Sequence, residues 1–131
     1  MFVYVDSSVC IPCWLPKYID YKYYIDLADS NRDIFSFMIV LSPNKEDKML
    51  SSHIVKTNNV LSGISYYSHG HFSVSGLRFK RCTANVFLTD SSGQVLIYGN
   101  PLTRRRTRDE YDKILKKNKI LKAESEKPNK E

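Results

Sequence analysis

Length, composition and charge exclude several classes of protein. The chain has 131 residues, of which 42% are hydrophobic and 12% aromatic, so one domain with a core is expected and disorder over the whole chain is excluded. The longest apolar run, Phe37–Leu41, is far too short to span a bilayer, which takes roughly 20 residues. The first residues have no basic region typical of a signal peptide, so we expect an intracellular protein with no membrane partner.

Basic residues are concentrated in the second half of the chain. Residues 1–75 carry 6 Lys and Arg against 7 Asp and Glu, whereas residues 76–131 carry 14 against 7. Such an asymmetry favours a polyanionic partner, most often nucleic acid, for the C-terminal half. The alternative is a Lys-rich helix and tail that are simply solvated.

The first 50 residues are predicted to be a strand-rich segment. A short edge strand is expected at Phe2–Val5, followed by a loop over residues 7–18 that contains two prolines. The loosely alternating stretch Tyr21–Leu27 precedes a turn at Asp29–Asp33. After it, Ile34–Leu41 has the pattern of the most buried strand.

Residues 51–122 show strands and turns that end in a helix. The expected strands are His53–Val60, Ile64–Tyr67, Phe72–Arg81, Thr83–Thr89 and Gln94–Tyr98. Asp90–Gly93 is a strong hairpin signal between the last two strands. From Pro101, with Asn100 as the cap, the pattern becomes that of an amphipathic basic helix, so the order of elements predicts an α+β fold. Residues 123–131 are charged and lack large apolar side chains, which predicts a disordered tail.

The cysteines allow two interpretations. Cys10, Cys13 and Cys82 are odd in number and follow no secretory signal, so a disulfide framework is not expected. Cys10 and Cys13 have the spacing of a zinc half-site, to which His69 and His71 could add two ligands. The other interpretation is a proline turn flanked by two small cysteines, with two loop histidines elsewhere. No cofactor is expected.

Common enzyme motifs are absent from the sequence. It contains no GxGxxG, Walker A, GxSxG or HExxH pattern. A nucleophile pair between Cys82 and His69 or His71 has nothing in the sequence to orient it. We therefore expect a protein that is not an enzyme.

Five short phrases follow one another in a fixed order over residues 54–121. They are Ile54-Val-Lys-Thr-Asn-Asn59, then Tyr67 and Phe72 with Arg78 and Lys80, then Ala84–Leu88, then Ser91-Ser-Gly93, and finally Gly99 before a helix from about residue 101. In order and spacing these phrases resemble one repeat of the TATA-box-binding protein family. The resemblance implies a curved antiparallel sheet with a C-terminal amphipathic basic helix, which is half of that family's saddle. Residues 1–50 would then be a degenerate first repeat or an unrelated segment.

The same resemblance implies a DNA-binding surface. That family lays its sheet in the minor groove and wedges phenylalanines between base steps. Together with the basic helix, it implies these nucleic-acid-binding residues: Val55, Phe72, Val74, Arg78, Lys80, Asn85, Phe87, Arg104, Arg105 and Arg106. Phe72 resembles the intercalating wedge, and Arg78 and Lys80 resemble the phosphate contacts. The alternative is that Phe72, Val74 and Phe87 line an ordinary core.

A single repeat is half of a groove-binding surface. The resemblance therefore implies a homodimer, or pairing with a transcription factor or polymerase. The implied function is a non-enzymatic module of transcription that binds duplex DNA in the nucleus, or in the host nucleus or cytoplasm for a viral protein. The alternative is a protein-interaction module with the same fold that has lost DNA binding.

Overall fold

The computed structural model describes residues 1–42, 44, 64–66, 74 and 76–121. The elements are β1 (Phe2–Asp6), α1 (Ile11–Trp14), the 3-10 helix η1 (Leu15–Tyr21), α2 (Lys22–Ser30), β2 (Met38–Ser42), β3 (Ile64–Tyr66), β4 (Asn85–Thr89), β5 (Val95–Tyr98) and α4 (Arg105–Lys117). The predicted α+β class and the C-terminal helix are confirmed. The predicted strand His53–Val60 and the tail 123–131 lie outside the described residues.

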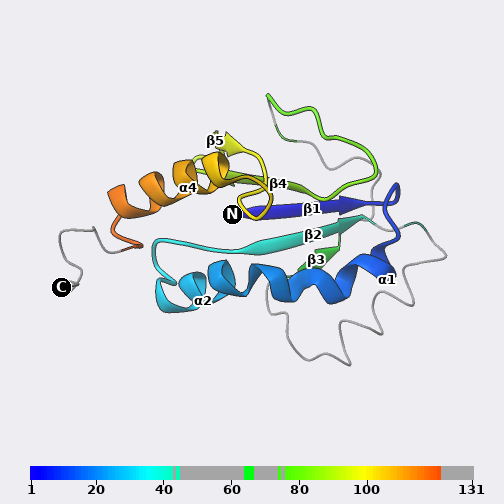
Figure 1. The fold of residues 1–131 in the computed structure, drawn as a ribbon, viewed down its shortest axis with the longest axis horizontal. Coiled ribbons are helices and arrows are strands. Elements are labelled where there is room, and N and C mark those ends of the chain that lie inside the picture. The colour runs from blue at the N-terminus through cyan, green and yellow to red at the C-terminus, as the bar shows by residue number, and fades with distance from the viewer. Residues whose placement is uncertain (43, 45–63, 67–73, 75, 122–131) are drawn as a thin grey trace.

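The five strands form one mixed sheet in the order β3-β2-β1-β4-β5 (Figure 1). β1, β2 and β3 are parallel, whereas β4 is antiparallel to β1 and β5 is antiparallel to β4. The prediction of a wholly antiparallel sheet is therefore wrong, and β1 is a central strand rather than an edge. The helices between β1 and β2 cause this, because a helical crossover returns the chain to the end where β1 began. Segments 1–50 and 51–122 thus contribute strands to one sheet.

The segment between β1 and β2 is helical, where a loop and an alternating stretch were predicted. Pro12 and Pro16 lie in the first turns of α1 and η1, where the N–H that proline lacks has no partner in the helix. Tyr21 and Tyr24 are buried and Ala28 is half-buried, which is a helical spacing of three and four residues. Tyr21, Tyr24 and Ala28 therefore mark the inner face of the helical segment.

One face of the sheet carries the main hydrophobic core, which the helices cover. The strand residues in this core are Val3, Val5, Ile39, Leu41, Val86, Leu88 and Ile97. Tyr24 of α2 and Tyr111 of α4 meet there with ring centroids 6.1 Å apart. Fully burying a side chain such as Leu115 stabilises the fold by about 1.5–3 kcal/mol. The helical crossover and α4 are thus held on the same side of the sheet. No helix in the described part of the chain is long and apolar enough to cross a membrane.

A smaller cluster lies on the opposite face of the sheet. Tyr4, Val40 and Phe87 form its centre. Phe79 packs over it, with its ring centroid 4.7 Å from that of Tyr4 and 5.8 Å from that of Phe87. The N–H of Leu77 donates a 3.0 Å hydrogen bond to the carbonyl of Val74, which closes a turn.

That turn corrects the prediction of a strand over Phe72–Arg81. The structure describes residues 74 and 76–81 of this predicted strand, and none of them belongs to a strand. Gly76 has a φ of +85°, a conformation that suits glycine and ends a regular alternation of side chains. The single strand face that such a strand would give to Val74, Arg78 and Lys80 therefore does not form.

The predicted hairpin is confirmed. Asp90 Oδ1 accepts hydrogen bonds from the N–H groups of Ser92 and Gln94, at 2.9 and 3.0 Å. Gly93 has a φ of +89°, which this turn requires.

The C-terminal helix begins later than predicted. Arg104 is its N-cap position, not Asn100. Asn100 instead forms a turn of its own, because its Oδ1 accepts a 2.9 Å hydrogen bond from the N–H of Leu102. Its Nδ2 donates at 3.1 Å to the hydroxyl of Tyr21, which ties the end of β5 to the helical crossover.

Candidate functional site

Cys10 and Cys13 lie at the junction between β1 and α1, and a disulfide joins them. Their Cα atoms are 5.2 Å apart, which is the spacing that one helical turn gives to positions i and i+3. Both residues are exposed. A disulfide framework was not expected, and this single disulfide was missed because an odd count says nothing about two cysteines that share one turn.

The third cysteine, Cys82, lies beside the loop that leads to this disulfide. Its N–H donates a 2.8 Å hydrogen bond to Ser8 Oγ, and Ser8 Oγ donates in turn to Asp6 Oδ1. Cys82 is a free, exposed thiol with a φ of +62°. The fold thus brings all three cysteines of the chain to one end of the sheet, a proximity that their sequence positions do not indicate.

The structure gives the zinc interpretation no further support. In the disulfide Cys10 and Cys13 have no thiolate, which is the form of cysteine that binds zinc. Their predicted partners, His69 and His71, lie outside the described residues. Within the residues that the structure describes, no group of three or more His, Cys, Asp or Glu could hold a metal ion.

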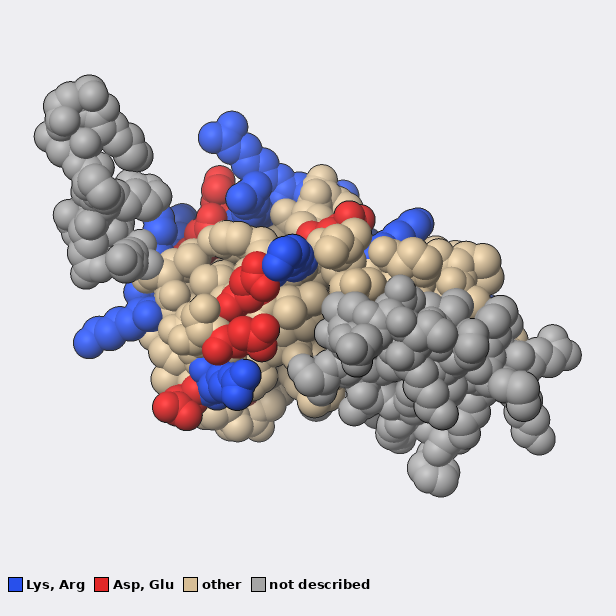
Figure 2. Space-filling view, turned by 90° about the horizontal axis from the view of Figure 1, so that it is seen from below, with Lys and Arg blue, Asp and Glu red and all other residues tan. Residues whose placement is uncertain are grey.

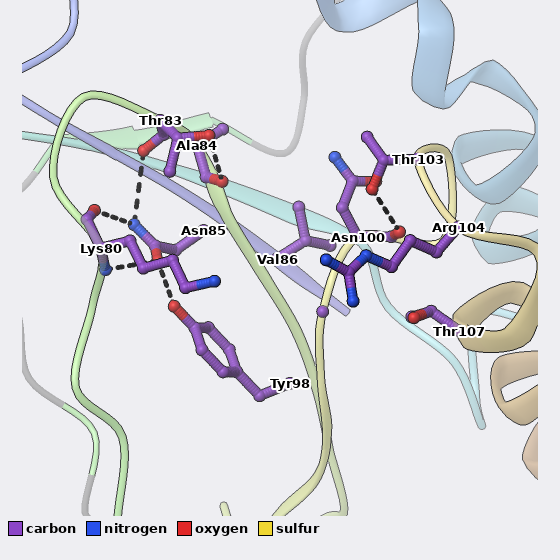
Figure 3. Close-up of a pocket in the computed structure, with 11 residues that line it drawn as sticks. Lys80, Thr83, Ala84, Asn85, Val86, Tyr98, Asn100, Thr103, Arg104 and Thr107 are labelled. Atoms are coloured by element: carbon purple, nitrogen blue, oxygen red, sulfur yellow. Dashed lines mark hydrogen bonds between the residues drawn. The ribbon is translucent and has the colours of Figure 1, made fainter.

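A polar cavity of about 280 Å³ opens where β4 begins and β5 ends (Figure 3). One wall is formed by Lys80 and residues 83–86, and the other by residues 98–100 with Thr103, Arg104 and Thr107. Figure 3 shows the Lys80 amine and the Arg104 guanidinium pointing into the space between these walls from opposite sides. No carboxylate of the described residues lines the cavity. Its potential is therefore positive.

Asn85 holds one wall of the cavity in place. It is only 3% exposed, and its Oδ1 accepts from the N–H of Lys80 at 2.9 Å and from the Tyr98 hydroxyl. Its Nδ2 donates to the carbonyls of Lys80 and Thr83, at 2.9 and 3.4 Å. Asn85 thus fixes the backbone on both sides of Cys82 and has its side-chain amide fully occupied.

The structure brings together only part of the predicted nucleic-acid-binding set. Arg78, Lys80, Arg104, Arg105 and Arg106 are exposed, and of these Lys80 and Arg104 meet at the cavity. Phe87 and Val74 belong to the small cluster on the sheet, as in the core alternative. Val55 and Phe72 lie outside the described residues. Tyr98 and Thr107, which also line the cavity, were not among the predicted residues because no local pattern marks either of them.

Charge on the helical crossover is mixed. Figure 2 shows Asp and Glu side chains next to Lys and Arg side chains on the face that it presents. Lys22 Nζ and Asp26 Oδ2 of α2 form an ion pair at 3.0 Å. A surface of this kind has no strong attraction for a polyanion.

No family model, curated protein or solved structure matches the chain.

Proposed function

We propose that the protein exchanges thiols and disulfides, with Cys10 and Cys13 as its redox pair. A Cys-x-x-Cys sequence within a βαβ unit is typical of thioredoxin-like redox sites. The observation that supports this function is the exposed Cys10–Cys13 disulfide, placed between β1 and the crossover to the parallel strand β2. Exposure matters because exchange requires a thiolate to reach one of the two sulfurs.

The reaction transfers two electrons and needs no metal. A thiolate of a substrate dithiol attacks one sulfur of the pair, which forms a mixed disulfide and releases the other cysteine as a thiolate. The second substrate thiolate then attacks the substrate sulfur of the mixed disulfide and releases the remaining cysteine. The substrate leaves as a disulfide, Cys10 and Cys13 are reduced, and the two substrate protons pass to their thiols. The reverse sequence reduces a substrate disulfide.

The test is a redox titration of the whole chain in mixtures of reduced and oxidised dithiothreitol. Thiols are trapped by alkylation and located by mass spectrometry. We expect Cys10 and Cys13 to change together in one two-electron transition. The rate of exchange with a chromogenic aromatic disulfide should exceed that of a short peptide containing Cys10–Cys13.

Three variants show whether the pair is responsible. Cys10→Ser and Cys13→Ser should each abolish the two-electron transition, whereas Cys82→Ser should leave it in place. Exchange no faster than in the peptide, or loss of the transition in Cys82→Ser alone, would contradict the proposal.

DNA binding through the basic start of α4 is a second candidate, supported by a group of exposed arginines. Arg104, Arg105, Arg106 and Arg108 surround the start of α4, where no acidic residue lies in the first turn. Neutralising about four phosphates would give a log–log salt dependence with a slope near −3.6 on duplex DNA. The double variant Arg104→Ala with Arg105→Ala should reduce that slope by about two units.

The two candidates have different consequences. The DNA-binding candidate is a non-enzymatic nuclear module that pairs with a second copy or with a transcription protein. It predicts that the protein binds duplex DNA and does not exchange disulfides. A flat salt dependence in the unmodified protein would contradict it. Partner binding by a folded protein without DNA affinity would favour the protein-interaction alternative.

A further inference from the structure

We propose that the polar cavity between Lys80 and Arg104 binds the phosphate group of a small ligand. The cavity is formed by β4, the end of β5 and the start of α4, and its chemistry does not depend on the redox state of Cys10 and Cys13. Its volume of about 280 Å³ is close to the lower end of small-ligand sites, roughly 300–1,000 Å³.

The two side-chain amides that line the cavity already have hydrogen-bond partners. The side-chain amide of Asn85 is occupied by Lys80, Thr83 and Tyr98. That of Asn100 is likewise occupied by the Tyr21 hydroxyl and the N–H of Leu102. A ligand in the cavity therefore meets two cations, the Lys80 amine and the Arg104 guanidinium, which point inward from opposite walls (Figure 3).

The start of α4 adds to this positive potential. The 13-residue helix follows Arg104 directly, and neither a capping side chain nor an acidic residue in the first turn offsets its N-terminal dipole. Thr107 of the first turn lines the cavity and lies close to Gly99, where an added Cβ would be 3.1 Å from Thr107 Cγ2. Gly99 thus allows the helix start to approach the end of β5, which keeps the cavity narrow.

Two cations on opposite walls match a phosphate better than a carboxylate. A phosphate monoester carries about −1.5 to −2 at pH 7, with three acceptor oxygens, whereas a carboxylate carries a single charge. The Arg104 guanidinium can hold two of the oxygens in its planar fork, and the Lys80 amine can approach the third as a point charge. Ala84 and Val86 supply apolar surface for the few other atoms that the cavity admits.

The test uses inorganic phosphate as the probe and the full chain labelled with ¹⁵N. Phosphate is titrated at constant ionic strength and pH 7, and amide shifts of Gly99, Thr103 and Thr107 are followed. We expect a saturable change in these amides. The double variant Lys80→Gln with Arg104→Gln should weaken the affinity by about tenfold or more, because two charge-assisted contacts are lost.

Matched controls come from neighbouring cations that do not line the cavity. Arg81→Gln and Arg108→Gln remove the same charge one position after Lys80 and one turn after Arg104, and each should keep the affinity within about twofold. All four side chains are exposed, so the variants should fold, which far-ultraviolet circular dichroism checks.

Three results would overturn the proposal. The first is the absence of saturable shifts up to about 50 mM phosphate, because binding weaker than this would not be specific. The second is an equal loss of affinity in the controls and the double variant, which would mean attraction by net charge alone. The third is acetate binding as tight as phosphate at the same ionic strength. If duplex DNA caused a saturable change in these amide shifts and phosphate caused none, Lys80 and Arg104 would be assigned to DNA binding instead.

Discussion

The N–H of Cys82 donates a 2.8 Å hydrogen bond to the hydroxyl of Ser8, across 74 positions of the chain. This bond joins the loop before β4 to the loop between β1 and the Cys10–Cys13 disulfide. Cys82 has a positive φ of 62°, which few residues other than glycine adopt, so the surrounding contacts must hold it there. The two loops are therefore joined at the end of the sheet where the Cys10–Cys13 disulfide lies.

Ser8→Ala should lower the free energy of unfolding by about 1 kcal/mol, because the N–H of Cys82 loses its acceptor and Asp6 loses a donor. Ser7→Ala is the matched control, since Ser7 is the exposed neighbour in the same turn, and it should stay within about 0.5 kcal/mol of the unmodified protein. Urea melts measure both variants. Equal stability of the two would show that the bond between the loops does not contribute.

Phe87→Ala should destabilise the protein by about 3–5 kcal/mol, as truncation of a large core residue does. Phe87 is only 1% exposed and stacks on Phe2 with ring centroids 5.2 Å apart. Leu96→Ala in the neighbouring strand is the comparison, because Leu96 is 44% exposed and its truncation should cost less than about 1 kcal/mol. A small effect at Phe87, with loss of DNA bending instead, would favour the groove-binding role implied by the resemblance.

Local signals in the sequence were sufficient for two elements of the C-terminal half, the hairpin and the last helix. The hairpin at Asp90–Gly93 was predictable because its turn depends on one side chain and one glycine within four residues. The amphipathic pattern likewise predicted α4, although its start at Arg105 was missed. Asn100 is a residue type that often caps helices, but its amide donates a hydrogen bond to the hydroxyl of Tyr21 instead. Tyr21 is far away in the sequence, so local patterns cannot reveal this contact.

The secondary structure and strand pairing of the N-terminal half depend on contacts between residues that are distant in the sequence. Tyr21 and Tyr24 fit either a loose alternation or a helix, and only their burial against the sheet and α4 decides between the two. The parallel pairing of β1 with β2 follows from that helix, so one wrong element changed the predicted sheet. The spacing of Cys10 and Cys13 alone fits a zinc half-site as well as the proposed redox pair, and it is the strand before it and the helix after it that favour the redox pair.

Stability should rise with pH between about 5 and 8 because of the α-amino group of Met1. This group donates a 2.7 Å hydrogen bond to the carbonyl of Ser36, and burial lowers its pKa from 8.0 to about 5. The unfolded chain therefore binds a proton that the folded chain does not in this range. The resulting contribution is full above pH 8 and is lost as the pH falls toward 5, on the order of 1 kcal/mol per pH unit.

Urea melts at several pH values test this dependence. N-terminal acetylation removes the titrating group, so the acetylated chain should show a flatter pH profile whatever its absolute stability. An unchanged slope after acetylation would assign the pH dependence to other groups.

Asn85→Ala should cost about 2–4 kcal/mol of unfolding free energy, more than the loss of one hydrogen bond. The substitution removes at once the hydrogen-bond partner of the N–H and carbonyl of Lys80 and of the Tyr98 hydroxyl, and it truncates a side chain that is only 3% exposed. Tyr98→Phe removes only one of these bonds and should cost about 1 kcal/mol. In the double variant the Tyr98 effect should nearly disappear, because the partner is already absent, and urea melts of the four proteins give this coupling directly. Since Asn85 also fixes Lys80 at the wall of the cavity, Asn85→Ala should weaken phosphate binding, whereas Tyr98→Phe should weaken it less. Additive effects of the two substitutions on stability would show that Asn85 does not act on Tyr98 through the hydrogen bond between them.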